Sequence, residues 1–195
     1  MSKSAPAAAP RPRSFRSAKE LRAWLQKEHA RADDLLLRIY KKASGVASVT
    51  HAEALQEALC FGWIDAQGMP FDASSWVQRF TPRKARSRWS KINVGHVERL
   101  IREGRMMPAG LNEMEAAKAD GRWAAAYDSP ANATVPPEFV KELARNAKAK
   151  QFYSTLNRAN LYAIAYRLQT AKRPETKVKR MKQIIGMLAR GETFH

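Results

Sequence analysis

The stretch that most constrains the fold is residues 54–93, ALQEALCFGWIDAQGMPFDASSWVQRFTPRKARSRWSKIN. It holds three of the five tryptophans and the only cysteine, and its residues 79–91 contain six lysines or arginines and no acid. Aromatic side chains bury large areas, whereas arginines are seldom fully buried without a partner. The stretch therefore predicts a packed scaffold with a charged face.

Hydrophobic periodicity around this stretch predicts an α+β fold. A helix is expected after Ser17, and Thr50 with Glu53 forms a capping box that opens a second helix ending near Gly62. Alternating or apolar runs predict short strands, and glycine and proline predict loops. The expected strands are residues 35–40, 63–65, 76–81 and 87–90, with a loop over residues 66–75. A small, mainly antiparallel sheet with helices on one side is the predicted architecture.

The second half of the chain reads as helix. Asn93 is expected to cap one helix and Pro108 to open the next. Three prolines in residues 128–137 predict a linker. Beyond it, apolar stripes that include Val140 and Val178 predict helices that bury these side chains. The expected organisation is a disordered tail (1–14), an α+β domain (15–127), the linker (128–137) and a helical subdomain (138–195).

Charge narrows the choice of partner. The formal net charge is +17, from 35 Lys and Arg against 18 Asp and Glu, and such an excess favours nucleic acid, anionic lipid or phosphorylated small molecules. The alternative is a basic protein whose charge is only solvated surface. A single cysteine excludes an intramolecular disulfide and a cysteine-rich metal site. No apolar run is long enough for a membrane span, and no secretory signal is evident, so we expect a cytoplasmic protein.

Four motifs together resemble the bacterial bacteriocin-protection family, also called YdeI or OmpD-associated proteins. They are EALCFGWID (57–65), QRFTPRKARSRWSKIN (78–93), GRMMPAGL (104–111) and AKRPETKVKRMKQIIGMLARG (171–191). The resemblance runs over residues 15–191. It implies an α+β N-terminal part, a helical C-terminal region, and a role in envelope stress and resistance to antimicrobial peptides or bacteriocins. It implies no reaction, cofactor or catalytic residue.

The basic segment is the first candidate binding site for an anion or a nucleic acid. Its candidate residues are Arg79, Arg83, Lys84, Arg86, Arg88, Trp89 and Lys91. Guanidinium groups bind phosphate or carboxylate with two parallel hydrogen bonds, and an indole accepts a stacked base. The alternative is a solvated turn in which Trp89 is a core residue and one arginine is paired internally.

Asp65 and Trp63 form the second candidate, as a structural clamp or part of a pocket. Asp65 stands in an apolar motif, and a buried carboxylate requires a partner, for which Arg79 or Arg83 is available. The clamp is favoured over a general base, because no second titrating group at a fixed spacing accompanies Asp65.

Three functions remain open from the sequence. The favoured one is a non-enzymatic stress-protection protein that binds an anionic partner. The alternatives are a nucleic-acid-binding protein that uses the basic segment, and an enzyme or sensor for a small anion. The common catalytic signatures are absent, and the four histidines lack metal-ligand spacing, which weighs against an enzyme. No cofactor and no metal are expected.

Overall fold

The computed structural model describes residues 12–195 and has the predicted α+β class. Within these residues it forms two compact units, one from residues up to 87 and 93–124, the other from residues 88–92 and 125–195. Residues 1–11 of the predicted tail lie outside the described part. Arg13, also assigned to that tail, pairs with β1, since its amide donates to Leu36 O at 2.8 Å.

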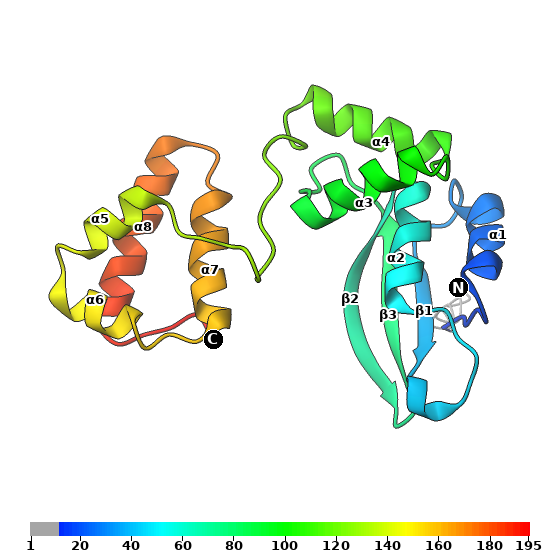
Figure 1. The fold of residues 1–195 in the computed structure, drawn as a ribbon, viewed down its shortest axis with the longest axis horizontal. Coiled ribbons are helices and arrows are strands. Elements are labelled where there is room, and N and C mark those ends of the chain that lie inside the picture. The colour runs from blue at the N-terminus through cyan, green and yellow to red at the C-terminus, as the bar shows by residue number, and fades with distance from the viewer. Residues whose placement is uncertain (1–11) are drawn as a thin grey trace, which may run out of the picture. The chain divides into compact units, whose positions relative to one another are not determined.

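The first unit contains a three-stranded antiparallel sheet in the order β1-β3-β2 (Figure 1). Its elements are α1 (Ala18–Glu28), β1 (Leu35–Tyr40), η1 (Lys42–Ser44), α2 (His51–Cys60), β2 (Trp63–Asp72), β3 (Ser75–Pro82), α3 (Lys91–Arg102) and α4 (Pro108–Ala119). The register pairs Leu35 with Phe80 in β1 and β3, and Trp63 with Pro82 in β2 and β3. The face that carries Phe80 also contacts α2, because the His51 ring lies 6.2 Å from the Phe80 ring.

The helix starts predicted after Ser17 and at Thr50 are confirmed. Ser17 Oγ accepts from the Glu20 amide, and Thr50 and Glu53 make both hydrogen bonds of a capping box. Each cap satisfies amides that the first turn of a helix leaves without an intrahelical partner.

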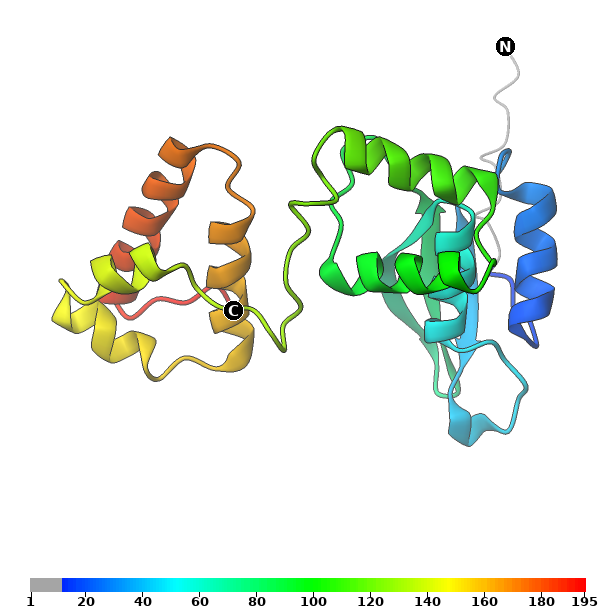
Figure 2. The same cartoon turned by 45° about the horizontal axis from the view of Figure 1, so that its top comes forward.

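Figures 1 and 2 show α2 across the sheet, with α1 beside β1.

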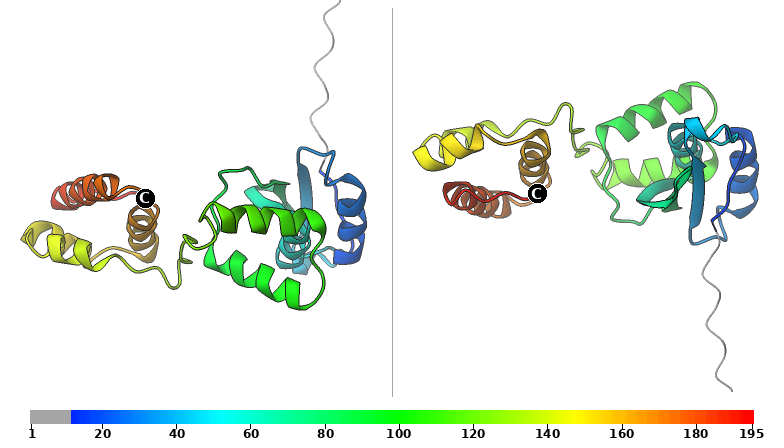
Figure 3. Two further views of the ribbon diagram at one scale, coloured as in Figure 1. Left: turned by 90° about the horizontal axis from the view of Figure 1, so that it is seen from above. Right: turned by 90° about the horizontal axis from the view of Figure 1, so that it is seen from below.

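The second unit is a bundle of four helices, α5 (Pro137–Leu143), α6 (Ala147–Tyr153), α7 (Arg158–Gln169) and α8 (Pro174–Ala189). The side chains of Asn146 and Asn157 cap α6 and α7 by accepting amide hydrogen bonds, and Pro137 and Pro174 stand at the starts of α5 and α8. Helix α8 packs against the other three helices (Figures 1 and 3). The core consists of Phe139, Leu143, Ala149, Ile164, Leu168, Met181, Ile184 and Leu188.

Several local predictions are wrong. The loop expected at 66–75 is mostly strand, because β2 runs to Asp72 and pairs with β3 through two register shifts. The strand expected at 87–90 is absent, and Ser90 forms an isolated β-bridge with Tyr127 in its place. Asn93 lies inside α3, which begins at Lys91.

Two side chains predicted to face the core of the second unit are exposed. Val140 and Val178 lie on the solvent side of α5 and α8, at 51% and 46% exposure. The apolar stripe of each helix is therefore narrower than its sequence pattern predicts.

The tight turn between β2 and β3 yields a pH-dependent prediction. Asp72 accepts hydrogen bonds from the Ser75 and Ser74 hydroxyls and the Ser74 amide, and pairs with Arg38 at 2.5 Å. The Ser75 hydrogen bond, with those of Ser74 and the charge of Arg38, lowers the pKa of Asp72 to about 2. A depressed folded-state pKa contributes stability that is present above the unfolded pKa and is lost as the pH falls through about 2.

We therefore expect Asp72→Asn to unfold at a lower urea concentration than the wild type at pH 7. The difference between the two midpoints should shrink as the pH falls from about 4 to about 2. Urea denaturation at pH 7, 4, 3 and 2 measures it. A difference that persists unchanged at pH 2 would contradict the assignment.

Candidate functional site

The basic-segment candidates in the first unit lie in different environments. Arg79 is exposed and its Nε donates to Asp34 Oδ2 at 2.9 Å. Arg83 is only 6% exposed, and its amide donates to Gly62 O at 2.9 Å. Lys84 and Arg86 are exposed in the turn that follows β3. Arg83 is therefore buried, whereas the other three side chains are exposed.

The remaining basic candidates belong to the second unit. Arg88 donates from Nη1 to the Tyr166 hydroxyl at 3.0 Å and lies over that ring at 5.7 Å. Lys91 Nζ pairs with Asp128 Oδ1 at 2.7 Å. Trp89 is 2% exposed, so its indole is a core group and not the stacking platform that the binding interpretation required.

Asp65 pairs with another side chain, but the arginine partner predicted for it is wrong. Asp65 Oδ2 lies 3.2 Å from His51 Nε2, while Arg79 pairs with Asp34 instead. The Asp65 side chain is 31% exposed, so it did not require an arginine to compensate burial. Trp63 is buried, and its Nε1 donates to His29 O at 3.2 Å.

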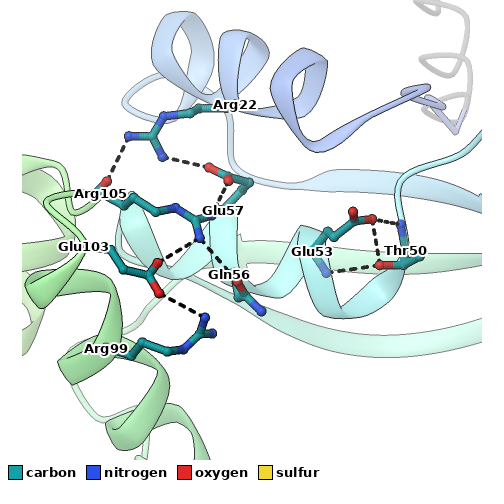
Figure 4. A network of polar contacts seen from close by, with 8 residues as sticks. All are labelled: Arg22, Thr50, Glu53, Gln56, Glu57, Arg99, Glu103 and Arg105. Carbon is teal, nitrogen blue, oxygen red and sulfur yellow. Dashed lines mark hydrogen bonds and ion pairs between the residues drawn. The ribbon is translucent and has the colours of Figure 1, made fainter.

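The buried ion cluster of the first unit is centred on Glu57 instead. Glu57 accepts from Arg22 Nη1 at 2.7 Å and from Arg105 Nη2 at 2.6 Å, while Arg22 Nη2 donates to Arg105 O at 2.8 Å (Figure 4). Glu57 is 4% exposed. The cluster joins α1, α2 and the α3–α4 loop, and its charges are satisfied inside the protein, so its role is structural.

Cys60 lies at the C-terminal end of α2, in the same part of the unit. The thiol is fully buried, and burial raises the pKa of this thiol despite the hydrogen bond with Arg22. A buried thiol with a raised pKa is a poor nucleophile. The geometry therefore supports the core role that the apolar context of Cys60 indicates.

A cavity of about 450 Å³ in the second unit has the features of a binding site. Its volume falls within the range of organic ligand sites. Helices α7 and α8 supply most of its wall, and three arginines face it. The lining residues are Arg88, Tyr166, Arg167, Thr170, Arg180, Gln183, Ile184, Met187 and Phe194.

Two of these arginines are held in place by the helices themselves. Arg180 Nη1 donates to Arg167 O at 2.6 Å, and Arg167 Nη1 donates to Ala163 O at 3.4 Å. The Arg167 guanidinium also lies 3.8 Å from the centre of the Phe194 ring. No acidic residue is among the residues of the described chain that line the cavity. The cavity is therefore a positively charged site with anchored guanidinium donors.

Sequence reasoning identified only part of this site. Arg88 belongs to the basic segment that the sequence shows, whereas Tyr166 and Arg180 were not among the candidates. Phe194 carried no signal, because its place depends on Asn160 Oδ1, which accepts from the Phe194 amide at 3.0 Å. The proximity of Arg167 and Arg180 also could not be predicted from their spacing in the sequence, because it depends on the packing of α7 against α8.

Two general features of the described residues bear on chemistry. Among residues 12–195, no group of three or more His, Cys, Asp or Glu side chains is placed to hold a metal ion. Over the same residues, no helix combines the length and the apolar character needed to cross a membrane.

The fold and the cavity define a basic α+β protein with a helical C-terminal unit that presents anchored arginines. Residues 13–113 match a family model described as a domain of unknown function, DUF8412. This match covers just over half of the chain, so the chain belongs to that family.

Residues 132–191 match a second family model, described as bacteriocin-protection, YdeI or OmpD-associated. The resemblance found in the sequence is confirmed for these residues, which match the bacteriocin-protection family. The DUF8412 match covers most of the chain that precedes these residues. Neither the curated proteins nor the solved structures include a match to this chain.

Proposed function

We propose that this chain is a stress-protection protein that acts by binding an anionic partner in the cavity of its helical unit, without catalysing a reaction. The observation that carries the proposal is the pair Arg167 and Arg180, which line a cavity that contains no acidic residue among its described walls. Hydrogen bonds between a guanidinium and a phosphate or carboxylate are among the stronger ones in proteins.

Charge argues for this route to protection over direct capture of a peptide. A chain with a net charge of +17 repels cationic antimicrobial peptides, so sequestration of such a peptide is electrostatically unfavourable. Binding of an anion is favoured by the same charge. A cytoplasmic location is part of the proposal, and cell fractionation tests it.

The test is calorimetric titration of the full chain with inorganic pyrophosphate. We expect Arg167→Gln/Arg180→Gln to weaken binding at least about tenfold, because two charge-assisted contacts are lost. The matched control is Lys148→Gln/Lys150→Gln, which removes the same charge from exposed positions on α6. Equal losses of pyrophosphate affinity in both variants would show that net charge alone causes the effect. An unchanged affinity in the Arg167→Gln/Arg180→Gln variant would contradict the proposal.

The nucleic-acid alternative is tested with a labelled single strand over a salt series. Lys84→Gln/Arg86→Gln is the suitable variant, because these side chains are exposed whereas Arg83 is buried. Binding with a steep salt dependence that this variant weakens would favour the alternative.

A further inference from the structure

The walls of the cavity are not uniformly polar. Thr170 follows the last residue of α7, and Arg180 donates to a carbonyl in the last turn of α7, so both lie near the α7–α8 connection. Phe194 is fixed near the opposite end of α7, since its amide bonds to Asn160 in the first helical turn. The cavity therefore has a polar end at Thr170 and Arg180.

An apolar path leads away from this end along α8. Ile184 and Met187 follow Arg180 by one and two helical turns, so Met187 lies about 10 Å along the helix axis from Arg180. Phe194 completes the apolar wall, with the Arg167 guanidinium over its ring. An inorganic anion would leave this wall without a contact.

We infer that the site takes an amphipathic organic anion: a phosphate or carboxylate head at Arg180 joined to a short apolar chain that lies along Ile184 and Met187. This inference rests on the proposed function of the cavity and adds the chemical class of its ligand. Burial of the chain contributes through the hydrophobic effect, which scales with the apolar area removed from water.

Octyl phosphate, kept below the concentration at which it forms micelles, is the probe. Calorimetry of the full chain compares it with inorganic phosphate and with octanol. We expect octyl phosphate to bind at least about tenfold more tightly than either one, because it combines the charged contact with the apolar contact. Arg180→Gln should weaken both phosphate-containing ligands.

A substitution in the apolar wall separates the contribution of the apolar contact from that of the charged contact. Met187→Gln keeps the length of this half-buried side chain, so the unit should remain folded. We expect it to reduce the affinity for octyl phosphate at least about threefold and to leave that for inorganic phosphate unchanged. The control is Met69→Gln, which alters a methionine of β2 that is 45% exposed.

The outcomes are distinct for the two proposals. Phosphate and octyl phosphate binding equally, both weakened by Arg180→Gln, would overturn the amphipathic ligand and keep anion binding. Octanol binding as tightly as octyl phosphate, or no binding of any probe, would overturn both.

Vesicles of phosphatidylcholine with and without phosphatidic acid distinguish the source of the anion. Octyl phosphate binding without sedimentation on the acidic vesicles would assign the site to a free anion. Sedimentation that Met187→Gln and Arg180→Gln abolish would assign it to a lipid, with the same chemistry.

Discussion

Replacing Gly110 by alanine is expected to destabilise the first unit by about 3 kcal/mol or more. Gly110 lies in the first turn of α4 against the end of α2, and a Cβ atom there would stand 2.3 Å from Cys60 O and 2.8 Å from Leu59 O. Both neighbours are backbone atoms, so the clash cannot be relieved by a rotamer change. Overpacking of this kind costs roughly 1–3 kcal/mol and occasionally more, and we expect the upper end here because backbone must move.

Gly95→Ala is the matched control for this substitution. Gly95 is an exposed position of α3, and no atom lies within 4 Å of the point that an added Cβ would occupy, so alanine should stabilise the helix by roughly 0.5–1 kcal/mol. Urea denaturation followed by tryptophan fluorescence reports on this unit, which contains Trp24, Trp63, Trp76 and Trp123. A Gly110→Ala midpoint equal to that of the wild type would contradict the close packing of α2 and α4.

Glu57→Gln is expected to destabilise the same unit by roughly 2–3 kcal/mol. The substitution removes the charge that pairs with both Arg22 and Arg105. Loss of one partner from a buried pair costs about 3–5 kcal/mol, and a lower value applies here because the arginine side chains are 25% and 34% exposed and can regain water.

The control for Glu57→Gln is Glu115→Gln. The Glu115 carboxylate is 64% exposed and its pair with Lys118 spans 3.5 Å, so its loss should change stability by less than about 1 kcal/mol. The same urea midpoints measure both variants. Equal, small effects would show that the Glu57 cluster does not stabilise the fold.

Local signals in the sequence predicted much of the fold. Ser17, Thr50 and Asn157 are effective caps because their side chains contact amides only three residues away. Strand β1 was likewise predicted from the apolar run of residues 35–40.

Long-range pairing determined what the sequence did not predict. Residues 66–72 have glycine and proline and read as a loop, yet they form a strand because β3 offers hydrogen bonds on that side. Asp65 was assigned an arginine partner, whereas it pairs with His51 of α2. The Glu57 cluster and the cavity combine residues more than ten positions apart, so neither has a sequence spacing to detect.

The most direct test of anion binding in the helical unit is a nuclear magnetic resonance titration of the isotopically labelled full chain with pyrophosphate. We expect the largest chemical-shift changes at the amides of residues 166–170 and 180–187 and at the Nε groups of Arg167 and Arg180. Changes confined to residues 79–86, or no changes at saturating ligand in either unit, would contradict it.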